Sequence, residues 1–409
     1  MPTITGYTYK GRNEAGKIVK GKMDASGEAA VASKMRMLGL SPVEIAAAPE
    51  ATGLNREISI PGLSKGVTLK DLAIMSRQMS TMTSAGLSLL RTLSILAEQT
   101  ESKPLAKILV TVRDDVEAGS SLSDSMKKFP QDFPPIMINM VRAGETGGFL
   151  DNALNTVATN FEKEVELRNS IKSAMTYPIV VVVMVILAVA GMLIFIVPVF
   201  KDMYEGMGGT LPLPTQFLVI LSQNMIWAGP LIIIVAVVTA IWWKQNKNTE
   251  SVRQKVDPLK LKMPVFGMLN VKLAIARFSR NFADMIGAGV PILQSLAIVG
   301  ETSGNWVIEK ALVKVADSVR TGKSIAGPLS EEPVFPAMVT QMVAVGEDSG
   351  ALQPMLEKIA DFYDQEVKTT TEQLTSLIEP LLIAFLGIVV GGMIVALYLP
   401  IFNIYSLIE

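Results

Sequence analysis

The chain of 409 residues contains neither cysteine nor histidine. The absence of cysteine excludes disulfides, thiol nucleophiles and cysteine-ligated metal sites. The absence of histidine removes the commonest general base, the usual catalytic triads and nearly every transition-metal site except those built only from carboxylates. We therefore expect no catalytic residue, no cofactor and no metal, and interpret the chain as a protein that is not an enzyme.

Charge is also scarce. Charged residues make up 18% of the chain and the formal net charge is −1, so nothing in the balance predicts nucleic-acid binding. Hydrophobic residues reach 49%, and the mean hydropathy is +0.39. A chain of this length with such a composition is too apolar for an ordinary soluble protein, which points to a protein of the membrane.

Three segments are long and apolar enough to cross a bilayer. Residues 179–197 carry no polar side chain, and residues 381–399 carry no charge. The remaining segment, residues 217–243, contains Pro230, which we expect to kink its helix. None of the three has a charged residue in its interior, which argues against an ion-coupled transporter. We place transmembrane helices at 178–200, 217–243 and 380–402.

Lysine and arginine predict how these helices are oriented, because cytoplasmic loops carry an excess of both. Residues 244–272 hold seven of them, whereas residues 201–216 hold only Lys201 and the tail after Leu399 holds none. We therefore expect the N-terminus and both large units in the cytoplasm, and the C-terminus outside it. The polar start of the chain predicts no cleavable signal peptide.

One plan occurs twice in the chain. Residues 77–96, RQMSTMTSAGLSLLRTLSIL, match residues 280–299, RNFADMIGAGVPILQSLAIV, without a gap. Further on, GETGGFL at 144–150 matches GEDSGAL at 346–352, and the register holds to the prolines that begin two of the apolar segments. Such a repeat fixes the number of domains and the topology together. Apolar residues at helical spacing indicate that each copy is a bundle of short helices followed by a membrane helix.

The expected fold is an all-α polytopic membrane protein with a small α+β unit at its N-terminus. Tyr7 and Tyr9 precede a turn at 13–16, as in a hairpin, and Ser26 is placed to cap a helix that ends at Gly39. The expected segments are an N-terminal cytoplasmic unit at 1–48, a linker at 49–68, helical domain 1 at 69–177, membrane helix 178–200, an extracytoplasmic loop at 201–216, membrane helix 217–243, helical domain 2 at 244–379, membrane helix 380–402 and an extracytoplasmic tail at 403–409.

RTGKS at 320–324 resembles the end of a phosphate-binding loop. That loop needs glycine five residues before Gly322, where this chain has Asp317. The matching stretch of the first copy, EAGSS at 117–121, has no lysine. We therefore interpret RTGKS as a turn that ends a helix, and not as a nucleotide site.

The paired GE-x-x-G elements are the first candidate site. Their residues are Gly144, Glu145, Gly148, Gly346, Glu347 and Gly350. We expect each element to form a tight turn in which glycine adopts backbone conformations closed to other residues. The two glutamates could act as acid/base groups or cation ligands, but more often such a residue caps a helix or faces a partner. We therefore favour helix capping or contact with a partner as the role of these two glutamates.

Two further candidate elements lie at the membrane. Tyr177–Pro178 and Glu379–Pro380 mark the junctions between domain and membrane helix, and proline makes both plausible bends. Glu379 is either a solvated boundary acid or a paired, functional carboxylate. In the last span, Gly387, Gly391 and Gly392 provide small residues at a spacing that allows close helix packing in lipid.

The ordered set of motifs resembles the polytopic inner-membrane platform proteins of type IV pilus and type II secretion machines, the PilC/GspF-type family. The resemblance covers nearly the whole chain. It rests on YTYKGRNEAGKIVKGKMDA at the N-terminus, RQMSTMTSAGLSLLRTL, both GE-x-x-G-x-L elements, TYP at 176–178 and IEP at 378–380.

The resemblance implies a scaffold without enzymatic activity in the inner membrane, with two cytoplasmic six-helix domains. Its partners would be a cytoplasmic hexameric ATPase, pilin or pseudopilin transmembrane helices, other inner-membrane assembly proteins and a second copy of itself. The expected function is the platform of a type IV pilus assembly machine. The alternatives are the equivalent platform of a type II secretion or DNA-uptake system and, from another class, a small-molecule transporter or channel.

Overall fold

The computed structural model describes residues 5–12, 18–25, 28–37, 41–47, 66–206, 211–264 and 266–404. They form two compact units, which divide between Lys65 and Gly66. The expected hairpin turn at 13–16, most of the linker, and both Ser26 and Gly39 lie outside the described residues.

The N-terminal unit contains a three-stranded antiparallel sheet with the strand order β2–β1–β3. Tyr7 of β1 pairs with Met23 of β2, as the predicted hairpin requires. The third strand was missed, because SPVEIAA has proline as its second residue and has few β-branched residues. Only β1 pairs with it, and proline is tolerated on such an edge strand. The elements of this unit are β1 (Thr5–Arg12), β2 (Ile18–Ala25), α1 (Glu28–Met37) and β3 (Ser41–Ala47).

Six helices form the first domain. The first of them begins with a capping box, in which Thr68 Oγ1 accepts from the Asp71 backbone N–H at 3.2 Å and Asp71 accepts from the Thr68 N–H at 2.9 Å. Thr68 thus belongs to the domain rather than to the predicted linker. The helices are α2 (Leu69–Ser84), α3 (Leu89–Gln99), α4 (Lys103–Glu117), α5 (Leu122–Lys127), α6 (Pro135–Gly147) and α7 (Leu150–Gly191).

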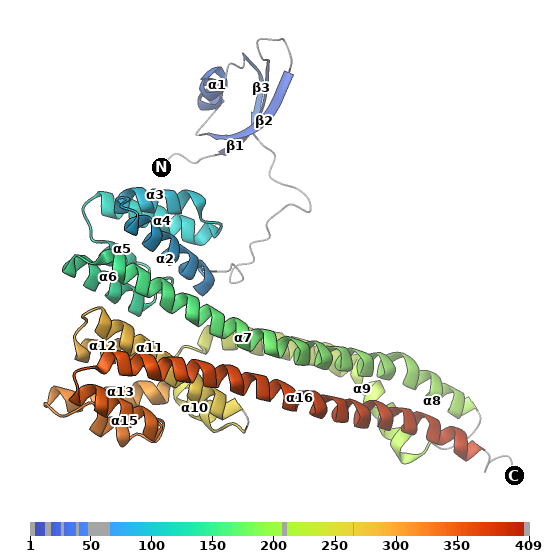
Figure 1. Ribbon diagram of the computed structural model, residues 1–409. Helices are drawn as coiled ribbons and strands as arrows, with labels where there is room; N and C mark the ends of the chain where they lie inside the picture. Colours follow the sequence, from blue (N-terminus) through green and yellow to red (C-terminus); the bar gives the residue numbers. More distant parts are fainter. Residues whose placement is uncertain are drawn as a thin grey trace. The chain divides into compact units, whose positions relative to one another are not determined.

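The second domain repeats these six helices in the same order and adds one before them (Figure 1). Its helices are α10 (Glu250–Lys262), α11 (Phe266–Gly287), α12 (Ile292–Thr302), α13 (Trp306–Arg320), α14 (Ala326–Ser330), α15 (Ala337–Asp348) and α16 (Leu352–Ile404). Helices α2 to α7 thus correspond to α11 to α16. The predicted fold class, with its repeated helical domains, is confirmed.

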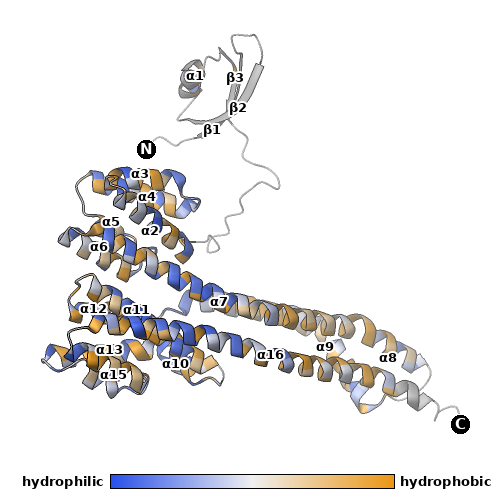
Figure 2. Ribbon diagram, in the orientation of Figure 1, coloured by the Kyte–Doolittle hydropathy of each residue, from blue (hydrophilic) through white to orange (hydrophobic). Residues whose placement is uncertain are grey.

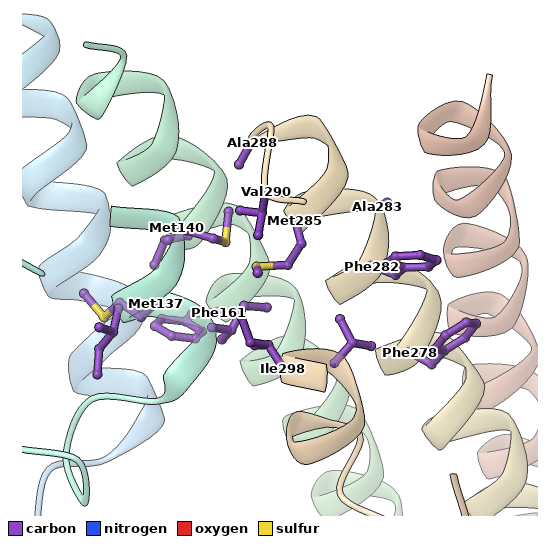
Figure 3. Packing of buried hydrophobic residues seen from close by; sticks show 14 of the residues in the cluster. Met137, Met140, Phe161, Phe278, Phe282, Ala283, Met285, Ala288, Val290 and Ile298 are labelled. Carbon is purple, nitrogen blue, oxygen red and sulfur yellow. The ribbon is translucent and has the colours of Figure 1, made fainter. Parts of the chain in front are cut away.

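One apolar core runs through both domains. Met140 of α6 and Phe161 of α7 lie close to Met285, Val290 and Ile298 of the second domain (Figure 3). All five side chains are at least nine-tenths buried. Since this core crosses the boundary between the repeats, the hydrophobic effect holds the two domains together as well as folding each one.

Three helices are long and apolar enough to cross a membrane, as predicted. The first continues from α7 through η1 (Met192–Ile196), a π-helical turn, into α8 (Val197–Gly206). The second is α9 (Leu213–Asn246), which stays helical through Pro230. The third is the distal half of α16. In Figure 2 the hydrophobic residues of α7 and α16 gather in their distal halves, away from the domains.

The two proline junctions, which we expect to act as bends, lie inside continuous helices. Helix α7 runs through Pro178 and α16 runs through Pro380 without ending. Proline lacks only one backbone donor, and at a membrane boundary water can reach the carbonyl that loses its partner. The helix geometry changes instead at η1. This turn contains Ile194, whose carbonyl would meet the ring of Pro198 in a regular α-helix.

Candidate functional site

The GE-x-x-G glutamates bind the start of a neighbouring helix. The Glu145 carboxylate accepts hydrogen bonds from the backbone N–H of Leu122 at 2.5 Å and of Ser123 at 3.1 Å. Those N–H groups open α5, where a helix has donors without internal partners and a partial positive charge. Helix capping, one of the alternatives weighed above, therefore describes what Glu145 contacts.

Glu347 makes the same contacts in the second domain. Its carboxylate accepts from the backbone N–H of Ile325 at 2.9 Å and of Ala326 at 3.2 Å, at the start of α14. Both glutamates are only partly exposed. The two repeats therefore use one carboxylate, late in their fifth helix, to hold the short fourth helix in place.

The glycines of these elements have two different roles. Gly148 and Gly350 have φ values of 76° and 68°, as expected for residues at a turn. Gly144 and Gly346 do not lie in turns, so the prediction for them is wrong. They lie inside α6 and α15, where a Cβ on Gly144 would be 2.6 Å from the Ala153 Cβ. The first glycine of each element is thus required by close helix packing and not by its backbone conformation.

The described residues contain no group of three or more Asp and Glu side chains that could hold a metal ion. RTGKS begins at Arg320, the last residue of α13, and Gly322 has a φ of 84°. Asp317 pairs with Arg320 at 2.6 Å. The stretch is a turn at the end of a helix, as predicted.

A polar layer joins the two domains where α7 crosses α11 and α16. Asn160 of α7 donates to Asn281 Oδ1 at 3.0 Å and to Asp284 Oδ2 at 2.5 Å, both on α11. One turn along α7, Glu164 accepts from Arg277 of α11 through two hydrogen bonds of 2.5 and 2.9 Å. This paired arrangement of a guanidinium with a carboxylate fixes the register of α7 on α11.

Burial changes the acidity of this layer. Burial raises the pKa of Asp284 from its ordinary 3.8 to about 6, against the opposing effects of Asn160 and Arg280. Burial also raises the pKa of Asp364, although Arg280 pairs with it. For Asp361, the effect of burial is outweighed by Lys163 and Arg280, so the pKa of this carboxyl is lowered.

Within each domain, one arginine bridges the first and the sixth helix. In domain 1, Arg77 of α2 binds Glu162 of α7 through hydrogen bonds of 2.6 and 2.8 Å, and this bond lowers the pKa of Glu162. In domain 2, Arg280 of α11 binds Asp364 of α16. The arginine and the acid occupy matching positions of the repeat. Because the pair recurs in both repeats, we interpret it as a contact that stabilises the fold of each domain, and not as a feature specific to one domain's surface.

Beside each bridge lies the groove between the first and sixth helices, and the two grooves differ. In domain 2, α7 covers the groove, and a space of only about 20 Å³ remains among Asn160, Glu164, Arg277 and Arg280. In domain 1, the groove between α2 and α7 is an open hollow of about 670 Å³, lined by Ala73, Ile74 and Val165 among others. We call this hollow the α2–α7 groove.

The remaining predicted site residues lie along the membrane helices. Tyr177 and Glu379 are exposed on unbroken helices. A Cβ on Gly387, Gly391 or Gly392 would meet nothing within 4 Å, so no described helix packs against these glycines. The spans instead meet at their outer ends in a cluster that includes Leu193, Leu218 and Met393. The Ser222 hydroxyl donates to the Leu193 carbonyl there at 2.5 Å.

Sequence reasoning missed the polar layer and the α2–α7 groove. The signal lay in the differences between the copies and not in their matches. Asn160, Arg277 and Asp284 correspond to Phe362, Ile74 and Thr81. An exchange of charged or amide side chains for apolar or uncharged ones at matching positions marks a face that is buried differently in the two repeats.

Comparison with known proteins places the chain among related sequences. A family model described as "Type II secretion system (T2SS), protein F" matches residues 75–198 and 278–400, one match for each repeat. The model of that family's N-terminal domain matches residues 1–46.

Several curated proteins are similar along their whole length. The chain is 41% identical to the type IV pilus assembly protein PilC of Myxococcus xanthus, over 98% of this chain and 96% of that protein. It is 42% identical to PilC of Thermus thermophilus, over 97% and 98%. It is 31% identical to the type II secretion system protein F of Aeromonas hydrophila, over 93% and 97%.

Proposed function

Because the chain belongs to the type II secretion system protein F family, we propose that it is the inner-membrane platform of a type IV pilus assembly machine. In this role it couples a cytoplasmic ATPase to the extraction and polymerisation of pilin subunits. The chain itself carries out no chemistry. It positions the ATPase at the cytoplasmic face of the membrane and the pilin subunits within the membrane.

The relatives favour a pilus machine over a secretion machine. Aeromonas hydrophila supplies one relative of each kind, and identity is 34% to its type IV pilus assembly protein TapC and 31% to its type II secretion system protein F. The similarity to PilC of two other bacteria is higher still, at 41% and 42%. These differences support pilus assembly as the activity and leave secretion as the second candidate.

The continuity of α7 and α16 is the observation that carries the proposal. Each helix begins in a cytoplasmic domain and ends at the far side of a membrane-length apolar segment. A displacement of the domain therefore moves the membrane part as well, because no flexible joint lies between them. We accordingly replace the expected bending at Tyr177–Pro178 and Glu379–Pro380 by transmission through rigid helices.

The proposed orientation of the chain in the membrane follows from the distribution of its lysine and arginine residues. The excess of lysine and arginine from Lys244 onward supports a cytoplasmic location for α10 and the second domain, on the side of the proposed ATPase. The N-terminus then lies in the cytoplasm and the C-terminus outside. The exposed apolar faces of the spans, which include Ile186, Ile232 and Phe385, are available to lipid and to pilin transmembrane helices.

A decoupling experiment tests the proposal. Four glycines inserted between Ser173 and Ala174, or at the matching site between Thr375 and Ser376, place a flexible joint between domain and membrane. Four alanines at the same sites keep the helix and add about one turn. In a strain that lacks this chain, we expect the wild type to restore surface pili, the alanine variants to restore a part, and the glycine variants to restore almost none.

Two measurements make the result interpretable. Immunoblots of membrane fractions must show that all variants are inserted in equal amounts. If the glycine variants restore pili as well as the wild type does, the rigid-helix mechanism is wrong. If the strain without this chain already makes pili, the assignment to pilus assembly is wrong.

A further inference from the structure

The two repeats leave one groove filled and the matching groove open. Helix α7 lies in the groove between α11 and α16, and it corresponds in the repeat to α16 itself. The α2–α7 groove is the counterpart of that filled groove. The structure thus contains one example of how such a groove is occupied, and the occupant is the sixth helix of the other repeat.

We propose that the α2–α7 groove of one copy receives the exposed face of α16 from a second copy of this chain. Phe362 is the central contact, because it corresponds to Asn160, which α7 inserts at the filled groove. The inference rests on the proposed platform function, whose family resemblance implies a second copy as a partner, and it names the two surfaces that meet.

Both proposed surfaces lose charge at matching positions. Where the filled groove has Arg277 and Asp284, the open groove has Ile74 and Thr81. On the helix side, Asn160 and Lys163 of α7 correspond to Phe362 and Gln365 of α16. At these positions the open groove carries fewer charges than the filled one, although Lys70, Arg77, Glu162 and Glu166 also line it. The α16 face proposed to meet it is more apolar than the matching face of α7.

Ile74 and Phe362 are also exposed where a soluble surface would favour polar residues. Their exposed fractions are 48% and 47%. Asn160, which corresponds to Phe362, is 7% exposed because the interface between the domains covers it. Large apolar side chains at the centre of a less charged groove and of its matching helix face are typical of a contact between proteins.

The membrane permits this contact. Helices α7 and α16 run side by side and both carry their apolar halves toward the same end (Figures 1 and 2). An α16 helix that enters the α2–α7 groove in the same manner lies along α7 and continues into the same bilayer. Each copy then offers one groove and one helix face, so the contact is head to tail and is repeated until a ring closes.

Single cysteines test the proposal, because the native chain has none. Two differently tagged full-length chains, one with Gln78→Cys and one with Phe362→Cys, are produced together and oxidised in isolated membranes, because Gln78 corresponds to Asn281, which accepts a hydrogen bond from Asn160 in the filled groove. We expect a disulfide-linked product that carries both tags. The matched control pairs Val110→Cys with Val313→Cys, which are exposed at matching positions of α4 and α13 and should give no such product.

A second measurement uses substitutions that give each face the residue of its counterpart. Phe362→Asn and Ile74→Arg alter half-exposed side chains, so the fold should persist, as circular dichroism will show. We expect each to weaken self-association in detergent about tenfold or more, which is the scale for loss of a central interface residue. Val313→Asn is the control and should leave self-association unchanged.

Each other outcome overturns the proposal. Cross-linking of Gln78→Cys chains only to one another would place the groove at a symmetric interface. Unchanged self-association of both substituted variants, together with lost binding of the cytoplasmic ATPase, would assign the groove to that partner. Since these measurements need no pilus assembly, they succeed or fail independently of the proposed function.

Discussion

The two helical domains share the contacts that fold them and differ in the surfaces that they present. In each, a glutamate late in the fifth helix caps the fourth helix, an arginine joins the first helix to the sixth, and a glycine allows the fifth and sixth helices to approach closely. The polar layer between the domains has no counterpart within the repeat. The residues that recur are therefore those that fold each domain, and the residues that differ are those that join it to something else.

The first way to break the comparison is at the shared glycines. Gly144→Ala places a Cβ 2.6 Å from the Ala153 Cβ and 3.0 Å from the Leu150 Cα, two atoms that cannot rotate away. In Gly346→Ala the nearest atoms are the Leu352 Cα at 3.0 Å and the Met355 Cβ at 3.1 Å. We expect the first change to destabilise its domain by about 2–4 kcal/mol and the second by about 1–2 kcal/mol.

Pulse proteolysis of the full-length protein in urea measures this difference, because the fragments report which domain has unfolded. Gly86→Ala is a useful reference, since that glycine has a φ of 86° but open space around it. Equal losses for Gly144→Ala and Gly346→Ala would mean that the two helix pairs relax equally well. The packing difference described here would then have no energetic effect.

The second comparison concerns the capping glutamates. Their exposure alone would predict little effect of Glu145→Ala or Glu347→Ala. Each carboxylate, however, satisfies two backbone N–H groups at the start of a short helix. We expect both variants to lose about 1–3 kcal/mol, with the loss confined to the domain that carries the change.

Glu145→Gln and Glu347→Gln sharpen this test. An amide oxygen can still accept a hydrogen bond, but it lacks the charge that favours a helix N-terminus, so a smaller loss is expected. The same proteolysis experiment measures all four variants. If the alanine variants keep full stability but fail to bind a partner, the main role of these glutamates is to contact that partner, and capping contributes little to stability.

The third comparison concerns pH and has the smallest effect. Asp284 corresponds to Thr81, so only the second domain carries this buried carboxyl. Its pKa is about 6 in the folded protein and 3.8 ordinarily, because burial outweighs Asn160, Arg280 and Lys163, while Glu357 raises it further. The stabilisation from its neutral form is therefore complete below about pH 4 and is lost as the pH rises through 6.

Asp284→Asn removes this dependence. We expect the variant to match the wild type near pH 4.5 and to be more stable at pH 8, by on the order of 1–2 kcal/mol after solvent exposure is considered. Thermal melting of the full-length protein in detergent at both pH values measures the difference. A variant that is less stable at both values would show that the ionised carboxylate itself holds the domains together.

The comparison also explains how far the sequence could predict the structure. The repeat, the three spans and the turn at Gly322 follow from local patterns, and the structure agrees with them. Gly144 and Gly346 were assigned the wrong role, because glycine was judged by its local conformational preference. Their role depends on what packs beside them, which a single sequence does not display.

The polar layer between the domains and the α2–α7 groove were harder to predict from the sequence than the roles of the glycines. Asn160 looks like any polar residue on the outer face of a helix until α11 is placed against it. Comparing the copies at Ile74 and Phe362 would have indicated two unlike faces, but it would not have revealed which of them is covered. Contacts between distant segments determine that, and the chain's local patterns do not encode them.

The unbroken helices also have a consequence for how this chain can change over generations. Removing one residue from a helix turns everything beyond it by about 100° and shortens it by about 1.5 Å. A deletion in α7 after Glu162 would thus rotate the membrane face of α7 away from α9 and α16 while its domain stayed in place. The separation along the chain from Glu145 to Pro198 equals that from Glu347 to Pro400. Both copies have therefore kept the same number of residues along this stretch, where substitutions rather than insertions distinguish them, although within the described residues only the first copy contains a π-helical turn.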